Sequence, residues 1–499
     1  MTKLLTSRLL GFAPARSRRE GSTGTSSLAR TACLIFAFCA AAAIASQAQT
    51  FSTLASFNGT NGADPRTGLV QGANGNFYGT TSYDGTNEAG TIFEVTPAGT
   101  LTTLYNFCSQ SCSEGASAGP LLLATNGNFY GITGSWGAIY KISPAGQFAT
   151  IYSFCPLMNC EERAWPGGTL VQARNGDFYG VTEHAGNGAG TVFEVTAKGE
   201  LTTLHTFDFT DGSDPSGLVL ATNGNIYGTT FGDADQIGCT QGCGTVFEMT
   251  PAGKLTTLYT FCSQTNCADG VGPSSLLQAR NGSLYGVTYG GVRNPGCPPN
   301  YGCGTVFKMT LAGKLTTIYT FCALPNCADG TNAFSLLQAT DGNFYGTADS
   351  FSGNNGSAFE LTPKGKLTTL YNFCSQTDCT DGSNPVAGML QGTNGILYGT
   401  TTSGGTDNDG VVFSLSVGLG LFVETTPTSG KIGAKVLVLG NDLKGATGVM
   451  FNGVDATITG DSNTAITATV PVGATTGAVE VMTASGKKLK SNLAFQVIP

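Results

Sequence analysis

A unit of roughly fifty residues is repeated seven times in this chain, between about Phe51 and Val417. The clearest recurring mark is a tyrosine followed by a glycine. It occurs at Tyr78, Tyr130, Tyr179, Tyr227, Tyr285, Tyr345 and Tyr398. A period near fifty residues is typical of β repeats arranged radially or in a stack, and it exceeds the periods of helical-pair repeats. The repeat therefore predicts an all-β architecture, and it indicates much less about chemistry.

The repeat around Tyr285 reads as four strands. A short apolar segment at 276–279 precedes Asn281-Gly282, a dipeptide typical of tight hairpins. Three further strand-like segments follow at 284–288, 304–309 and 315–321. Four antiparallel strands joined in this way form one blade of a β-propeller.

The two ends of the repeat region complete each other. Residues 51–57 match the fourth strand of a blade, but no first, second or third strand precedes them. The last repeat has the first three strands of a blade, at 389–391, 397–401 and 411–415, but no fourth strand. Pairing 51–57 with 411–415 closes a ring and removes exposed strand edges. We therefore predict a seven-bladed β-propeller over residues 49–417, closed by its N-terminal strand; six or eight blades are the alternatives.

Residues 1–48 have the pattern of an export signal peptide. Six basic residues precede or flank the apolar run 31–45, and Ser46-Gln47-Ala48 offers small residues for cleavage. Removal of this segment leaves 18 basic and 31 acidic residues, a balance of −13. Such a chain lacks the basic surface that nucleic acids require, and no transmembrane segment is expected after the signal. We expect a secreted, periplasmic or cell-surface bacterial protein.

The fourteen cysteines outside the signal form seven close pairs. They are Cys108/Cys112, Cys155/Cys160, Cys239/Cys243, Cys262/Cys267, Cys297/Cys303, Cys322/Cys327 and Cys374/Cys379. Short-range pairs in an exported chain indicate disulfide bonds. The alternative, zinc, lacks the usual two-residue ligand spacing, and His184 and His205 are the two histidines.

Alternating hairpins assign the predicted loops to two faces. The turns after the first and third strands are short and uniform, and we call their side the turn face. The loops after the second and fourth strands are long and variable, and they hold every cysteine pair. We call that side the cysteine-bearing face. Because binding residues tend to lie on variable loops above a rigid scaffold, we expect any ligand there.

A C-terminal module is predicted at 421–499, where the repeat stops. Its alternating segments at 436–440, 448–453, 466–471 and 478–481 are typical of a small immunoglobulin-like β-sandwich. The segments Phe451-Asn452-Gly453 and Thr475-Thr476-Gly477 resemble the IPT/TIG family. In bacterial surface proteins, that resemblance implies a spacer or adhesive role.

The repeats resemble the tandem GloVer repeat of exported bacterial proteins, the choice-of-anchor family. The resemblance rests on segments such as Gly68-Leu69-Val70-Gln71, Tyr78-Gly79-Thr80-Thr81 and Gly190-Thr191-Val192-Phe193, and it covers all seven units. It implies no catalytic residue.

Acidic residues recur where the chain enters a blade. They are Glu114, Glu162, Asp211, Asp269, Asp329 and Asp381, with Asn61 at the corresponding place in the first repeat. A ring of such carboxylates is suited to a ligand or to Ca²⁺, whose ligands are hard oxygens; we expect no cofactor, with Ca²⁺ as the alternative. The alternative is that Asp and Asn start tight turns before glycine.

Three further residues are candidate ligand contacts. His184 lies beside Glu183 in a variable loop, where a histidine and a carboxylate suit acid–base chemistry. Trp136 and Trp165 lie in loops of the same face and offer flat surfaces for a sugar, the alternative being loop packing. His205 replaces a tyrosine of the fourth strand and is expected to pack.

Three classes of function remain open. The favoured one is an exported, non-catalytic protein that binds a glycan, a surface protein or another envelope component on the cysteine-bearing face. The second is a propeller enzyme that acts on carbohydrate as a lyase or hydrolase. The third is a purely structural envelope protein. The ligand and the oligomeric state are left open.

Overall fold

The structure is a computed structural model that describes residues 49–109, 112, 114–135, 137–155, 165–232, 243–292, 297, 302–349 and 355–498. The predicted signal at 1–48 lies outside these residues. Gln49–Pro499 form one compact unit. No helix in the described part of the chain has the length and hydrophobicity that a bilayer crossing requires.

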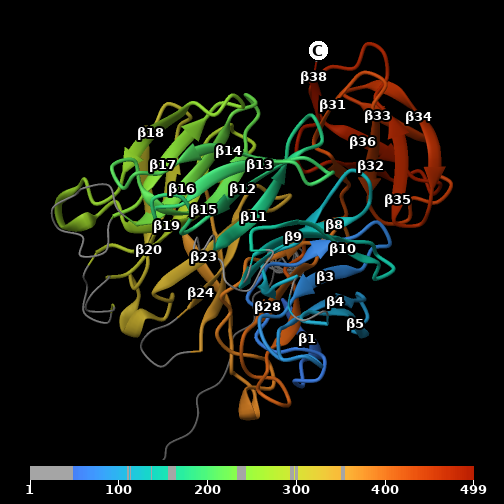
Figure 1. Cartoon of the computed structure of the whole chain (residues 1–499). Helices are drawn as coiled ribbons and strands as arrows, with labels where there is room; N and C mark the ends of the chain where they lie inside the picture. The colour runs from blue at the N-terminus through green and yellow to red at the C-terminus, as the bar shows by residue number, and fades with distance from the viewer. Residues whose placement is uncertain are drawn as a thin grey trace, which may run out of the picture. The chain divides into compact units, whose positions relative to one another are not determined.

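Seven sheets of the same design account for the repeats (Figure 1). The first blade comprises β2 (Val70–Gln71), β3 (Phe77–Thr80), β4 (Thr91–Val95) and β5 (Leu101–Asn106). The second comprises β6 (Ala116–Ala118), β7 (Leu122–Leu123), β8 (Phe129–Ser135), β9 (Ala138–Ile142) and β10 (Phe148–Ser153). The third comprises β11 (Pro166–Gln172), β12 (Phe178–Thr182), β13 (Thr191–Val195) and β14 (Leu201–Thr206).

The next three blades keep the same order of strands. The fourth comprises β15 (Ser213–Leu220), β16 (Ile226–Gly232), β17 (Thr245–Met249) and β18 (Leu255–Thr260). The fifth comprises β19 (Val271–Gln278), β20 (Leu284–Gly290), β21 (Thr305–Met309) and β22 (Leu315–Thr320). The sixth comprises β23 (Asn332–Gln338), β24 (Phe344–Asp349), β25 (Ser357–Leu361) and β26 (Leu367–Asn372). First strands of successive blades contact each other, as β11, β15, β19 and β23 do, so they surround the central axis.

The seventh blade joins the two ends of the repeat region. Its sheet order is β1 (Thr50–Ser56), β29 (Val411–Ser416), β28 (Leu397–Thr401) and β27 (Leu390–Gln391). β1 pairs antiparallel with β29, and Phe51 lies opposite Leu415. In Figure 1, the blue β1 accordingly lies beside the orange strands of the last repeat. The seven-bladed propeller closed by its N-terminal strand is confirmed.

The recurring Tyr-Gly pair has a packing explanation. The glycine lies under an aromatic ring of the third strand in its own blade: a Cβ on Gly79 would be 2.6 Å from Cζ of Phe93. The tyrosine contacts the next blade, as Tyr78 does with Phe129 at 4.2 Å between ring centroids. The same pair thus builds both the interior of a blade and the interface between blades, which explains why it repeats.

Glutamines at the ends of the first strands also link neighbouring blades. Gln278 Oε1 accepts the N–H of Thr222 in the preceding blade at 2.8 Å. Gln71 Oε1 accepts the N–H of Thr393 at 3.0 Å, which joins the seventh blade to the first. Because these buried or half-buried amides bond across blades, the ring is held by side chains as well as by β1.

The C-terminal module is a curled antiparallel sheet. Its order is β30 (Glu424–Thr426), β32 (Lys435–Leu439), β35 (Ala465–Thr469), β34 (Val454–Asp461), β33 (Gly448–Phe451), β36 (Val479–Met482) and β37 (Lys488–Lys490). β31 (Ser429–Lys431) and β38 (Gln496–Ile498) form a separate parallel pair. Val438 of β32 and Val481 of β36 share one buried cluster, so the sheet encloses its own core.

This module contacts the turn face of the propeller. Thr464 Oγ1 donates to the carbonyl of Ala73 at 2.7 Å, and Asn441 Nδ2 donates to Thr393 Oγ1 at 2.8 Å. Asn492 Nδ2 donates to the carbonyl of Gln338 at 3.1 Å. The short, uniform turns of this face therefore receive the C-terminal module.

Candidate binding site at the cysteine-bearing face

The loops of the cysteine-bearing face are closed by disulfide bonds between near neighbours. The described pairs are Cys108–Cys112, Cys262–Cys267, Cys297–Cys303, Cys322–Cys327 and Cys374–Cys379. Cys155 and Cys243 are also disulfide-bonded. Their expected partners, Cys160 and Cys239, lie outside the described residues. Three of the loops contain a short 3-10 turn: η1 (Thr265–Cys267), η2 (Pro325–Cys327) and η3 (Thr377–Cys379).

Metal binding by these cysteines has no support in the geometry. In the described segments, the cluster of potential metal-ligating atoms consists of Cys297, Cys303 and Cys322, and these sulfurs are in disulfides. A disulfide sulfur lacks the thiolate that binds metal ions. No group of three acidic residues in these segments has metal-ligating geometry.

Four of the recurring carboxylates are buried inside their loops. Asp269, Asp329 and Asp381 are fully buried, and Glu114 is 3% exposed. Asp269 Oδ2 accepts hydrogen bonds from the Tyr259 hydroxyl at 2.8 Å and the Ser263 N–H at 2.9 Å. The side chain thus ties the outer strand to the following loop. This loop-closing role is distinct from the tight turn before glycine that was the alternative to ligand binding.

Three further carboxylates form this clamp. Asp329 Oδ2 accepts from the Tyr319 hydroxyl at 2.6 Å, and Asp381 Oδ2 accepts from the Tyr371 hydroxyl at 2.7 Å. Glu114 Oε1 accepts from the Ser109 N–H at 2.9 Å. A buried carboxylate that receives several donors is stabilised as an anion. These groups are therefore committed to the loops.

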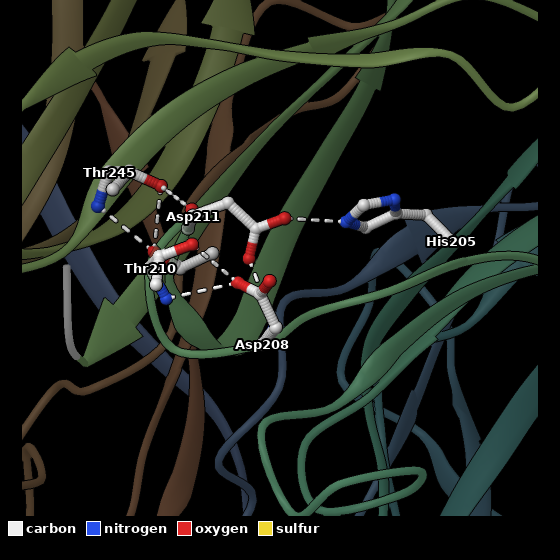
Figure 2. A network of polar contacts seen from close by, with 6 residues as sticks. His205, Asp208, Thr210, Asp211 and Thr245 are labelled. Atoms are coloured by element: carbon white, nitrogen blue, oxygen red, sulfur yellow. Dashed lines mark hydrogen bonds and ion pairs between the residues drawn. The ribbon is translucent and has the colours of Figure 1, made fainter.

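Between the third and fourth blades, His205 of β14 takes the place of the clamp tyrosine (Figure 2). Its Nε2 lies 2.7 Å from Asp211 Oδ2, and Asp211 Oδ1 accepts the N–H of Asp208 at 3.1 Å. Asp208 Oδ1 in turn accepts from the Thr210 hydroxyl at 2.6 Å. These bonds from Thr210 hold the pKa of the exposed Asp208 carboxyl below its usual range. His205 also contacts Phe207 edge to face, so it packs as expected and bonds the clamp acid.

Two of the predicted contact residues, Trp165 and His184, lie together. Their ring centroids are 5.9 Å apart, and Trp165 is 47% exposed. His184 Nδ1 lies 3.2 Å from Asp214 Oδ1, and the side chains are 48% and 36% exposed. Trp165 precedes β11, His184 follows β12, and Asp214 belongs to β15 of the next blade. Because β11 and β15 are first strands that lie around the axis, this cluster lies near the axis on the cysteine-bearing face.

Glu183 forms the inner side of the same cluster. Its N–H donates to the carbonyl of Trp165 at 2.6 Å, which joins the two chain segments. Burial raises the pKa of the Glu183 carboxyl, and the charge of Asp214 raises it further, while His184 opposes the shift. A carboxyl with a raised pKa beside a histidine–carboxylate pair is suited to proton transfer. We call Trp165, Glu183, His184 and Asp214 the mouth cluster.

Sequence reasoning did not identify Asp214. The residue occupies the position just before the recurrent proline, where Asp64, Ser117 and Asn384 also stand, and all four have a positive φ. The left-handed conformation therefore recurs in several repeats and gives no signal for a site. Two other predicted contacts, Glu162 and Trp136, lie outside the described residues.

The closed ring of seven four-strand repeats, with long loops on one face, defines a β-propeller. The chain belongs to the Gloeobacter/Verrucomicrobia repeat family, whose sequence model matches residues 41–233, 133–297 and 292–437. No curated protein matches this sequence significantly.

Solved structures with a similar fold include two propeller enzymes. A streptogramin B lyase is 15% identical with a TM-score of 0.51, and the alignment covers 74% of this chain and 97% of that chain. A catalytically inactive virginiamycin B lyase from Staphylococcus aureus with quinupristin is 16% identical with a TM-score of 0.51, covering 74% and 99%. At these identities the likeness shows the fold alone.

Proposed function

We propose that this protein binds a carbohydrate outside the cytoplasm, at the channel mouth of the cysteine-bearing face. The observation that carries this proposal is the convergence of Trp165, His184 and Asp214 from two adjacent blades. An export-like N-terminal sequence and the disulfides support the location, since disulfides persist in oxidising compartments.

The chemistry of the mouth cluster fits a sugar. The exposed face of Trp165 offers a flat apolar surface, and His184 and Asp214 offer polar atoms for hydroxyl groups. Small-ligand sites combine an aromatic wall with a few convergent polar groups in this way. Binding at the axis also brings loops from several blades within reach of one ligand.

A glycan array followed by titration of the strongest ligand tests the proposal. We expect Trp165→Ala to weaken binding roughly tenfold or more, because truncating a central aromatic contact typically costs over 1 kcal/mol. The matched control is Phe209→Ala, since Phe209 is 40% exposed in a loop of the same face but outside the cluster. Absence of any bound glycan, or equal binding by the Trp165→Ala variant and the parent, would reject the proposal.

A carbohydrate lyase or hydrolase is the second candidate, favoured by the raised pKa of Glu183 beside the His184–Asp214 pair. Incubation of the bound glycan with the protein, followed by chromatography, tests it. Turnover that is lost in Glu183→Gln while binding persists supports an enzyme. Binding without any new product leaves the non-catalytic function, and neither binding nor turnover favours a purely structural envelope protein.

The C-terminal module completes the proposal as a spacer. Its resemblance to the IPT/TIG family implies an immunoglobulin-like module that separates or supports a binding domain. Contacts such as Thr464 with Ala73 place it against the turn face. The contacts of the module therefore lie on the face opposite the mouth cluster.

A further inference from the structure

A cavity of about 930 Å³ lies between the turn face of the propeller and the C-terminal module. Its propeller wall includes Arg174, Thr222 and Arg280, which follow first strands of three adjacent blades. Its other wall includes Lys490 and Asn492 at the end of β37. This volume lies in the range of small-molecule sites. It is separate from the mouth cluster, which lies at the other end of the axis.

Two arginines of this cavity are held without a carboxylate partner. Arg174 Nη2 donates to the carbonyl of Thr222 and to Gln496 Oε1, each at 3.0 Å. Arg280 donates to the carbonyls of Ala339 and Thr340 and to Asn492 Oδ1. None of the ion pairs in the described segments involves either arginine.

These bonds position the guanidinium groups but do not use all their donors. An arginine has five N–H donors, and the hydrogen bonds of Arg174 in the described segments come from Nη2 alone. Burial lowers the pKa of Arg280, and nearby Asp341 opposes that shift. Even so, a guanidinium stays charged in proteins. Two fixed positive charges therefore face this cavity, and each guanidinium has N–H donors beyond those in the hydrogen bonds described above.

Lysines add to the positive charge of the cavity. Lys488 and Lys490 both line it; Lys488 pairs with Glu480 at 2.6 Å, whereas Lys490 is in none of the ion pairs of the described part. The chain as a whole is acidic, with a net charge of −8. A concentration of unpaired cations in one concave site of an acidic protein favours an anionic occupant.

Uncharged groups complete the lining. Thr222, Gln278 and Asn492 offer hydroxyl and amide groups, and Phe422 offers an apolar surface. Guanidinium groups match planar or tetrahedral oxyanions by paired hydrogen bonds. We propose that the cavity binds a small anionic ligand that carries a carboxylate, sulfate or phosphate group on a polar body. This site is independent of the proposed carbohydrate site.

Isothermal titration of the purified full chain with sodium glucuronate, inorganic sulfate and inorganic phosphate tests the proposal and distinguishes the three anionic groups. We expect saturable binding of at least one probe that weakens with rising salt. The Arg174→Gln/Arg280→Gln double variant should lose roughly tenfold or more in affinity, since it removes charged donors whose hydrogen bonds to an anion are stronger than those between neutral groups.

The matched control is Lys254→Gln/Lys314→Gln, which removes the same charge from exposed turns outside the cavity. It should bind as the parent does. Lys490→Gln, at an exposed position of the cavity, should weaken binding several-fold, and it serves as a second variant if the arginine variant fails to fold. Failure of all three probes to bind, or an equal loss in the cavity and control variants, overturns the proposal.

Discussion

Gly79 lies beneath the ring of Phe93, directly opposite it on the neighbouring strand of the first blade. The Cβ that any other residue would add at this position would be 2.6 Å from Phe93 Cζ and 2.9 Å from Leu69 Cδ2. This contact recurs where a Tyr-Gly pair meets a third-strand phenylalanine. The lack of space for a Cβ therefore explains the glycine. A special backbone conformation does not, since the φ of Gly79 is not in the left-handed region.

Substituting Gly79→Ala should lower the free energy of unfolding by about 1–3 kcal/mol, because overpacking of a closely packed core is destabilising. The urea midpoint measures the effect. Gly460→Ala is the control, since a Cβ there meets nothing within 4 Å. Combining Gly79→Ala with Phe93→Leu should cost less than the sum of the two single changes, because leucine frees space under the ring. Strict additivity would contradict this packing explanation.

Deleting β1 should open the ring. The seventh blade would then present the edge of β29, and exposed strand edges promote pairing with other chains. We expect larger species in size-exclusion chromatography with light scattering. The control is Phe51→Ala, which removes the stacking on Tyr371 at 3.8 Å but keeps the strand. It should lower the unfolding midpoint without changing the size of the protein, and an unchanged size after deletion would argue against ring closure by β1.

Asp381 should make stability depend on acid pH. Burial opposes its ionisation, but hydrogen bonds from Tyr371, Ser375 and Gln376 outweigh burial and hold the pKa of its carboxyl below the usual 3.8. Because the folded pKa lies below the unfolded one, the stabilisation is complete above pH 3.8 and is lost as the pH falls through the lowered value.

Asp381→Asn should therefore cost about 1–3 kcal/mol at neutral pH, because buried donors lose a charged acceptor. Urea midpoints between pH 7 and pH 3 should converge for this variant and the parent as the pH falls. Asp407→Asn, at an exposed position, should follow the parent throughout. A constant gap between Asp381→Asn and the parent down to the lowest pH would show that the clamp does not depend on the carboxylate charge.

Removing one disulfide should affect its loop more than the ring. Cys262 and Cys267 are five positions apart, and closing so short a loop contributes about 2 kcal/mol in the chain-entropy model. In Cys262→Ala/Cys267→Ala, hydrogen exchange should rise in the loop between β18 and β19 while the strands stay protected. Loss of protection throughout the blade would mean that the disulfide holds the fold.

The ring architecture was predictable because it depends on local, repeated patterns. Strand alternation, the Asn-Gly turns and the Tyr-Gly mark recur in each unit, and a fourth strand at 51–57 without the first three implied closure with 411–415. The disulfides were predictable for the same reason, since residues such as Cys374 and Cys379 are close along the chain.

The candidate site was only partly predictable. His184 and Trp165 were recognisable as a polar and an aromatic residue in variable loops. Asp214, in contrast, belongs to another repeat and stands where several other repeats also place polar residues. The acidic position before glycine has the same sequence pattern whether it binds a ligand or closes a loop. The buried bonds of Asp269 and Asp381 distinguish the two.

The sequence by itself determined the blades, their number and their closure, because these follow from short-range alternation and from a strand count. Only the tertiary structure decided which side chains meet across blades and where the C-terminal module lies. Thr464 and Ala73, for example, are 391 positions apart and share a hydrogen bond. Such contacts depend on the complementarity of surfaces that form only after each part has folded, and no local pattern encodes that complementarity.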